Sequence, residues 1–187
     1  MNGKVFFAAD THFGDDRIIK YENRPFADAD EMDRVLIEKW NSVVSDNDSV
    51  FLLGDFSSYA LEKSGEICRR LNGRKFLVMG HHDTFNERQY SECGFEGVSR
   101  YPIIYENFWI LSHEPLYVNK NMPYANIFGH FHANPIYKTI SEQSFCVSIE
   151  RIGYTPIEFE DIKQKIRETD PDLEEKNKCH QLLKPKT

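Results

Sequence analysis

The sequence predicts an α/β protein with two sheets, the first of them parallel. Three apolar runs, at residues 4–9, 50–53 and 75–79, have the length and composition of short buried strands. Segments with helical spacing separate these runs, and this alternation is typical of a parallel sheet covered by helices on both faces. After Gly97 the apolar runs follow one another with no room for helices, which predicts a second, more antiparallel sheet.

The helices of the first half are marked by their ends. Asp28 has the position of an N-cap residue, and Glu31 follows three residues later, as in a capping box. Apolar residues then recur at helical spacing on one face: Met32, Val35, Leu36, Trp40, Val43 and Val44. A second helix is predicted over residues 61–71, where Asn72-Gly73 would end it.

The second half contains four apolar runs and one helical segment. The runs at residues 101–105, 108–111, 126–128 and 145–149 predict strands, and residues 161–168 predict a closing helix. From residue 169 the chain is polar and charged, so we expect a tail that is ordered in part at most. The predicted division is one domain over residues 1–168, which the length of the chain allows, and a polar tail over 169–187.

Composition favours a globular protein without affinity for long nucleic acid. Hydrophobic residues make up 40% of the chain and aromatic residues 13%, more than a disordered chain would contain. The net charge of −7 argues against a basic surface for long nucleic acid, although bound divalent cations would reverse the local field. We also expect no membrane span, because no apolar run approaches ~18–20 residues.

The cysteines and the first residues predict a cytoplasmic protein. Cys68, Cys93, Cys146 and Cys179 show no paired spacing, which is typical of reduced thiols. The sequence has no opening charged segment followed by a long apolar run, so we expect no signal peptide.

Six of the seven histidines fall in four short motifs that each follow an apolar run. The motifs are Asp10-Thr11-His12, Gly80-His81-His82-Asp83, Ser112-His113-Glu114 and Gly129-His130-Phe131-His132, and Gly54-Asp55 has the same placement without a histidine. In parallel sheets ligands bind at the carboxyl ends of strands, where we expect these motifs. Imidazole and carboxylate together suit manganese, iron or zinc, and the motifs supply enough donors for two ions.

The order of these motifs resembles the calcineurin-like metallophosphoesterase family. The family pattern is Asp-x-His, Gly-Asp, Gly-Asn-His-(Asp or Glu), His and Gly-His-x-His, and the match extends from Asp10 to His132. Residues 154–162 also resemble the ending of small bacterial and phage members. Each motif alone is weak, but five motifs in the same order leave little room for coincidence.

The resemblance implies a four-layer α-β-β-α sandwich of two mixed sheets, with the metal site at the sheet edge. Transferred residue by residue, it assigns ligands to a first metal (Asp10, His12 and His132), to a second metal (His113 and His130) and to both (Asp55). Manganese is the expected divalent metal, and iron, zinc, nickel and cobalt also suit these donors.

The implied activity is hydrolysis of a phosphoester by a hydroxide that bridges two divalent metals. His82 would lie beside the scissile phosphate, with Asp83 orienting its ring, and protonated His82 could donate to the departing oxygen. No long insertion covers the site, so we favour a phosphodiester, such as a nucleotide, over a monoester. Asn23 or Arg24 could contact the substrate, and the alternative is that they belong to a solvated helix face.

The chain departs from the family pattern at position 81, where histidine replaces asparagine. His81 can still bind a metal, through nitrogen instead of a carbonyl oxygen, and would then shift the second site towards softer metals. Two other interpretations stay open. His81 is displaced and the second site is weak, or the chain is an engineered variant of a parent with asparagine.

Two rival functions compete with the enzyme. A catalytically weak or inactive scaffold of the same fold would serve as a protein-binding surface, but such scaffolds typically have broken metal motifs. Here every ligand position except 81 matches the family. A nuclease for long nucleic acid would need a basic surface, which the composition does not predict. The sequence predicts no particular oligomeric state.

Overall fold

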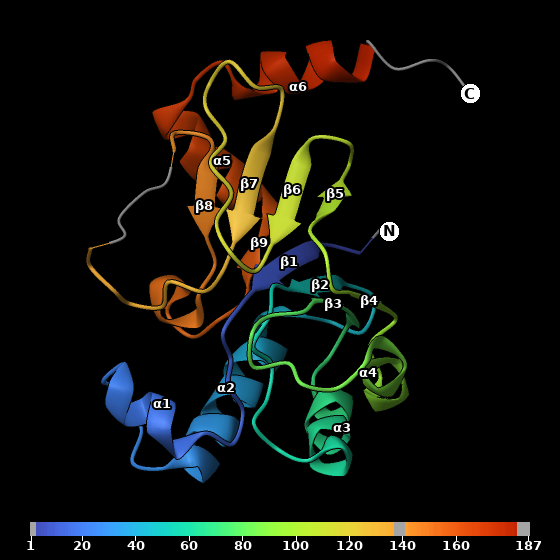
Figure 1. The fold of residues 1–187 in the computed structure, drawn as a ribbon, viewed down its shortest axis with the longest axis vertical. Helices are drawn as coiled ribbons and strands as arrows, with labels where there is room; N and C mark the ends of the chain where they lie inside the picture. Colours follow the sequence, from blue (N-terminus) through green and yellow to red (C-terminus); the bar gives the residue numbers. More distant parts are fainter. Residues whose placement is uncertain (1–2, 137–140, 183–187) are drawn as a thin grey trace.

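The computed structural model describes residues 3–136 and 141–182, which form two sheets stacked between helices (Figure 1). The first sheet has the strand order β4 (Gly97–Ser99), β3 (Arg74–Val78), β2 (Ser49–Leu52), β1 (Val5–Ala8) and β9 (Ile157–Glu158). Strands β1 to β3 are parallel, as predicted. Strand β4 adds a fourth parallel strand that was not predicted, and β9 pairs antiparallel with β1 at the edge.

Helices connect the parallel strands of the first sheet. They are α1 (Asp16–Tyr21), α2 (Ala29–Val43), α3 (Leu61–Arg70) and α4 (Glu87–Cys93). Helices α2, α3 and α4 lie on one side of the first sheet, below it in the view of Figure 1. The Asp28 side chain accepts a hydrogen bond from the Glu31 N–H (2.8 Å), which confirms Asp28 as the cap of α2. The helix predicted over residues 61–71 is confirmed as α3, whereas α1 and α4 were not predicted.

The second sheet corrects one expectation. Its strand order is β5 (Ile103–Tyr105), β6 (Trp109–Ser112), β7 (Ala125–Phe128) and β8 (Ser144–Cys146). Only the β5–β6 pair is antiparallel, and the β6–β7 and β7–β8 pairs are parallel. The expectation of a more antiparallel sheet is therefore wrong. The connections over 113–124 and 129–143 are long enough to return the chain to the same end of the sheet.

The end of the chain corrects a second expectation. After the 3₁₀ turn η1 (Ile149–Ile152), helix α5 (Phe159–Thr169) confirms the predicted closing helix. The expected tail then contains another helix, α6 (Leu173–Leu182), which the polar composition did not predict. Leu173 is buried, and the Lys176 ammonium donates to the Asp170 carboxylate (2.6 Å), which fixes the start of α6. Residues 183–187 of the expected tail lie outside the described residues.

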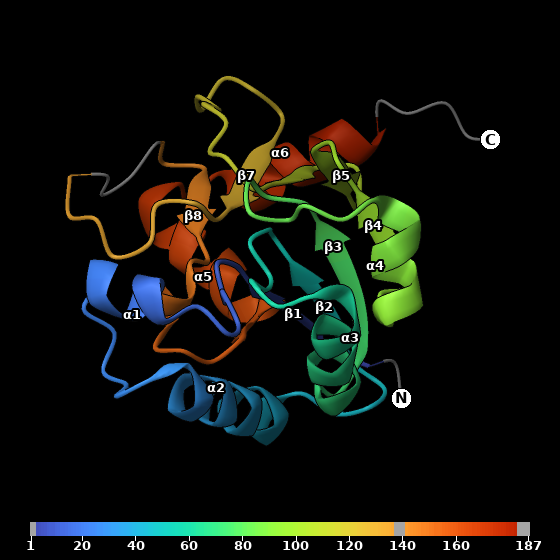
Figure 2. The same ribbon diagram turned by 60° about the horizontal axis from the view of Figure 1, so that its bottom comes forward.

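Two apolar cores join the layers into the four-layer α-β-β-α sandwich. The first core lies between the first sheet and α2 to α4, and it contains Trp40 and Ile67. The second core lies between the two sheets and reaches α5, where the Phe159 ring contacts those of Phe7 (5.4 Å between centroids) and Trp109 (5.0 Å). Figure 2 shows α2 and α3 along the lower side of the same stack. Among residues 3–136 and 141–182, no helix is long and apolar enough to cross a membrane.

Candidate metal centre

The polar motifs lie together at the carboxyl ends of strands from both sheets. They occupy the loops after β1 (Asp10, His12), β2 (Asp55), β3 (His81, His82, Asp83), β6 (His113) and β7 (His130, His132). Backbone hydrogen bonds join these loops, from the Asp10 N–H to the Gly54 carbonyl (3.0 Å) and from the Gly129 N–H to the His113 carbonyl (3.0 Å). The His130 N–H also donates to the Asp10 carboxylate (2.8 Å), so the loops of the two sheets form one connected layer at the sheet edge.

The backbone is strained where it presents the motif side chains. Asp10, His12, Asp55, His130 and His132 all have positive φ angles, between 45° and 72°. For residues other than glycine the left-handed region costs about 1–2 kcal/mol each. Such strain gathers at functional sites, because the surrounding structure must hold it in place. Here the two sheets and their connected loops provide that support.

Two motif glycines are required because the loops approach so closely. A Cβ atom on Gly54 would lie 2.3 Å from His113 Nδ1, and Gly54 also has a φ of +90°. A Cβ atom on Gly80 would lie 2.3 Å from Asp55 Oδ1. Real Cβ atoms do not make such contacts, so glycine at these positions lets the β2, β3 and β6 loops meet around Asp55.

The first group of donor atoms belongs to Asp10, His12, Asp55 and His132. One donor atom from each lies within 4.8 Å of all the others. His12 Nε2 is buried without a hydrogen-bond partner and lies 3.5 Å from Asp55 Oδ2. Burial raises the pKa of Asp10, although His132 and His113 oppose this rise. A nearby cation would favour the ionised form of this buried carboxyl group.

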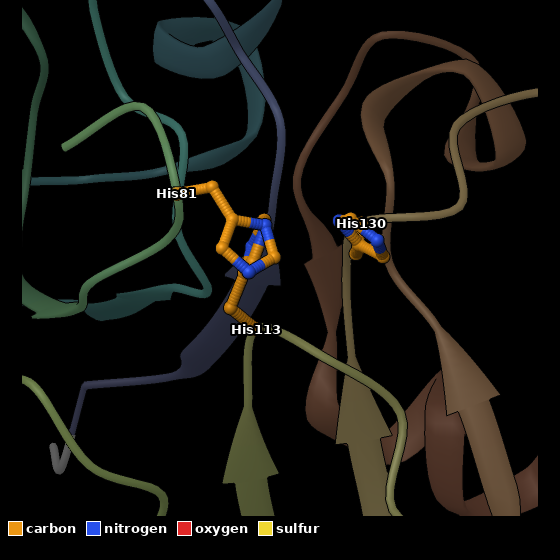
Figure 3. A group of neighbouring side chains, drawn as sticks. All are labelled: His81, His113 and His130. Atoms are coloured by element: carbon orange, nitrogen blue, oxygen red, sulfur yellow. The ribbon is translucent and has the colours of Figure 1, made fainter.

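The second group is made of three imidazoles, from His81, His113 and His130 (Figure 3). The Nδ1 atom of His113 lies 2.9 Å from the Leu53 carbonyl and, as a donor to it, leaves Nε2 as the free ring nitrogen. That Nε2 atom is buried without a hydrogen-bond partner, 3.5 Å from Asp55 Oδ2. Burial and the neighbouring His113 lower the pKa of His130, which favours the neutral ring that a metal requires.

Asp55 lies between the two groups. Its Oδ2 atom is 3.5 Å from the Nε2 atoms of both His12 and His113, and its Oδ1 atom accepts the His82 N–H (2.8 Å). Burial would raise the pKa of Asp55, but His12 and His113 overcome it and hold that pKa well below its usual range. The two unpartnered buried nitrogens face one ionised oxygen, so the donors present fit divalent metals on either side of it.

The structure places Arg24 differently from the sequence expectation. Its guanidinium group is buried and donates to the carbonyls of Asp10 (2.7 Å) and Thr11 (2.9 Å). It also forms an ion pair with Glu150 (2.6 Å). The expected substrate contact by Arg24 is therefore wrong. Arg24 instead holds the backbone of the first metal loop.

Glu150 is a residue that the sequence reasoning missed. Its Oε1 atom lies 3.0 Å from His132 Nδ1, which leaves His132 Nε2 free to bind a metal. Burial opposes ionisation, but His132 and Arg24 lower the pKa of Glu150, so the carboxylate stays charged. A signal was present, because Glu150 directly follows the apolar run over 145–149, as the other site residues follow theirs.

The open side of the centre is a cleft of about 580 Å³. Asn23 is exposed and does not line it, so the structure does not bring this expected substrate contact to the site. Helix α1 instead contributes Arg17 and Tyr21, and Asn134 lies on the opposite loop. Arg17 is held by paired hydrogen bonds to Asp15 (3.0 Å each), which also lower the pKa of Asp15 to about 2 against the effect of burial.

His82 and Asp83 separate in the structure. His82 is exposed in the cleft, with its ring centroid 5.1 Å from that of His12. Asp83 is buried, and its carboxylate accepts the N–H groups of Asp55, Phe56 and Gly80 (2.8–3.0 Å). The expectation that Asp83 orients the His82 ring is therefore wrong. Asp83 fixes the β2 and β3 loops, because a carboxylate is the natural acceptor for several converging backbone donors.

His81 lies at the metal centre, next to a partner that the sequence did not predict. Its side chain lies among the three imidazoles of the second group, which is the arrangement that the metal-binding interpretation of His81 requires. Its Nε2 atom is 3.0 Å from Oε1 of Glu114, for which the sequence reasoning gave no role in the site. Both side chains are more than half exposed, so water reaches this pair.

A two-sheet α/β sandwich with clustered His and Asp side chains at its edge is the arrangement of a protein that could hold metal ions. Comparisons with known proteins identify the family. The chain matches the calcineurin-like phosphoesterase model over residues 3–186, and it belongs to that family. The uncharacterized protein MJ1445 of Methanocaldococcus jannaschii is 34% identical over 163 residues, which are 84% of this chain and 88% of that protein. The family implies metal-dependent phosphoester hydrolysis.

Two further similarities are more limited. The protein of unknown function AQ665 from Aquifex aeolicus shares the fold, with a TM-score of 0.68 and 23% identity over 87% of this chain and 99% of that one. The Gene 66 protein of Mycobacterium phage L5 is 38% identical over 83 residues, which are 42% of this chain and 39% of that protein.

Proposed function

We propose that this protein is a phosphodiesterase with two divalent metals. The observation that carries the proposal is the position of Asp55 Oδ2, 3.5 Å from the free Nε2 atoms of both His12 and His113. The proposed ligands are Asp10, His12 and His132 for one metal, His81, His113 and His130 for the other, and Asp55 for both. Divalent metals held there would make hydroxide available near neutral pH and offset the charge of the phosphate.

The protein's own groups supply the remaining steps. His82 lines the cleft, so a ring N–H is available there to donate to the departing ester oxygen. Arg17 is fixed by Asp15 on the wall of the cleft, where a guanidinium group can bind phosphate oxygens. Asp83 and Glu150 contact loop backbone and His132, respectively, so we assign them to positioning.

The open cleft supports a diester substrate. A diester carries a group on each side of the phosphorus, so its site must extend beyond the phosphate. The cleft runs from the metal centre to Tyr21 on α1 and Asn134 on the opposite loop, and Tyr21 is 82% exposed. We therefore favour a small diester of nucleotide size. The net charge of −7 makes long nucleic acid a poor substrate.

The test compares hydrolysis of an aryl phosphodiester with that of the matching aryl phosphomonoester. We expect turnover with Mn²⁺, a faster rate with the diester, and no turnover with a chelator. Asp55→Asn should lower the rate by about 100-fold or more, because both metals lose a charged ligand. Asp46→Asn, an exposed carboxylate in the turn before β2, is the matched control and should keep full activity. No hydrolysis with any of the compatible metals would favour a scaffold.

A further inference from the structure

The two donor groups of the centre differ in chemical character. Asp55 lies between the two groups and is shared by them, so Asp10 and Asp55 give the first group two carboxylates beside two imidazoles, whereas the second group has three imidazoles and only the shared Asp55. Carboxylate oxygen suits Mn²⁺ and Mg²⁺, whereas imidazole nitrogen suits Zn²⁺ and its neighbours in the first transition row. Unlike donor sets at neighbouring positions predict unlike metal preferences.

The three imidazoles surround one common space. Their ring centroids form a nearly equilateral triangle, with 5.1 Å between His81 and His113, 4.9 Å between His81 and His130, and 5.1 Å between His113 and His130. The rings meet edge to face, at 69° to 84°, so they do not stack. Figure 3 shows that they come from three separate loops, with His130 opposite the other two.

Glu114 places a carboxylate next to the ring of His81. Metal-bound histidines commonly donate their second ring N–H to a carboxylate, which fixes the tautomer and raises ligand affinity. Glu114 Oε1 lies 3.0 Å from His81 Nε2, so Nδ1 is the nitrogen left for a metal. In the first group His132 also has a carboxylate partner, because its Nδ1 atom is hydrogen-bonded to Glu150, which leaves Nε2 free.

From these observations we propose that His81, His113 and His130 form a trihistidine site that prefers Zn²⁺ to Mn²⁺ more strongly than the first site does. Glu114 is the positioning residue that orients His81 in this site. The inference rests on the metal centre of the proposed function, but it concerns metal selectivity and makes no use of turnover.

Metal binding by the whole chain tests the inference. The metal-free protein is titrated with Zn²⁺ and, separately, with Mn²⁺ in competition with a chromophoric chelator, and bound metal is counted by mass spectrometry. We expect two bound zinc ions in the unmodified protein. His81→Asn should weaken the second zinc ion by about 10-fold or more and change Mn²⁺ binding much less, because an amide oxygen replaces a nitrogen donor. His180→Asn on α6 is the matched control and should bind as the unmodified protein does.

Glu114→Gln separates the positioning role from simple proximity. The amide keeps the size of Glu114 but removes the negative charge that lies 3.0 Å from His81 Nε2, so second-site zinc affinity should fall by about 10-fold. Unchanged zinc affinity in His81→Asn would overturn the trihistidine site. Unchanged affinity in Glu114→Gln alone would overturn the role of Glu114. If the protein shows the expected zinc binding but hydrolyses no phosphoester, the proposed function fails and this inference stands.

Discussion

At the scale of single residues, the metal centre depends on a buried ion pair that contacts the loops carrying its ligands. The side chains of Arg24 and Glu150 are almost completely buried and are joined at 2.6 Å. Glu150 also contacts the His132 ring, and Arg24 holds the carbonyls of Asp10 and Thr11. One ion pair therefore sets the geometry of two metal loops. Such a pair adds little net stability, but removal of one partner leaves the other charge uncompensated.

Glu150→Ala should lower the free energy of unfolding by about 3–5 kcal/mol, because Arg24 would remain buried without its carboxylate partner. Urea denaturation measures this loss. Glu38→Ala removes the partner of Arg34 in an exposed ion pair on α2 (3.2 Å) and should cost less than about 1 kcal/mol. Equal losses in the two variants would contradict the role of the buried pair.

Gly54 and Gly153 separate backbone strain from steric crowding. Both have positive φ angles, +90° and +68°, but a Cβ atom on Gly153 would meet nothing within 4 Å. Gly153→Ala should therefore cost only the backbone term of about 1–2 kcal/mol. Gly54→Ala should cost about 3 kcal/mol or more, because it also collides with His113. Chemical denaturation of both variants checks this, and similar losses would show that the loops can move apart.

The residues that the sequence predicted well are those whose motifs end apolar strands. All seven expected donor side chains gather at the centre, because parallel strands bring their carboxyl ends to one edge. Arg24 and Asp83 were misassigned because charge and closeness in sequence do not reveal which way a side chain points. Arg24 turns into the protein to satisfy buried carbonyls, and Asp83 turns towards backbone donors. Glu114 and Glu150 depend on long-range contacts that no local pattern encodes.

At the scale of elements, strands β1, β2 and β3 could be predicted from their continuous apolar runs. These runs are apolar because both faces of each strand are buried in the two cores. Helices α1 and α4 were missed because both are short, and α4 depends on a capping box between Asn86 and Gln89. Strand β9 has only two residues, and pairing with β1 defines it. The parallel direction of β7 and β8 could not be predicted, because the loops that join parallel strands and those that join antiparallel strands have similar composition.

The turn between α2 and β2 should give the protein a measurable acid dependence. The Asp48 carboxylate accepts the N–H groups of Lys4 (2.7 Å) and Ser45 (2.8 Å) and the Ser45 hydroxyl (2.7 Å). Burial alone would raise the pKa of Asp48, but these hydrogen bonds overcome it and lower that pKa below its usual value. A lowered pKa in the folded state stabilises the protein above the unfolded pKa, near 3.9, and this contribution is lost as pH falls through the folded pKa.

Asp48→Ala should therefore lower the free energy of unfolding by about 1.5–3 kcal/mol near pH 7, because three donors lose a charged acceptor. The difference from the unmodified protein should shrink as pH falls below about 4. Urea denaturation from pH 3 to pH 7 measures it. Asp46→Ala, on the exposed side of the same turn, should show almost no loss at any pH. A loss from Asp48→Ala that is constant with pH would exclude the carboxylate charge as its cause.

Helix α6 should contribute to stability although its sequence is polar. Leu173 is buried with Ile162 and Ile166 of α5 in the second core. Leu173→Ala should therefore cost about 2–5 kcal/mol. Cys179 is exposed on the same helix, and Cys179→Ala should stay within about 0.5 kcal/mol. Unfolding curves of both variants check this. If Leu173→Ala left the free energy of unfolding unchanged, α6 would contribute nothing to stability, as expected of a tail.

At the scale of the whole molecule, the centre joins two sheets that pack through one apolar core. Asp10, His12 and Asp55 come from the first sheet, whereas His113, His130 and His132 come from the second. Neither sheet holds a complete site, so the donors meet only when both sheets are folded and stacked. Metal affinity is therefore a property of the folded chain, and metal binding must stabilise that state relative to the unfolded one.

Metal loading should accordingly raise the free energy of unfolding by about 2.7 kcal/mol for each independent site when the free ion is at 100 times its Kd. Urea denaturation with Mn²⁺ or Zn²⁺, and with a chelator, measures the increment. His12→Ala should lose the increment in the free energy of unfolding that comes from the first site, and His113→Ala the increment from the second. Each increment is the difference between the metal-loaded and metal-free forms of the same variant. His180→Asn should retain both. If the double variant His12→Ala/His113→Ala kept the full increment, the metals would bind elsewhere, and the sheet edge would not be the centre of this protein.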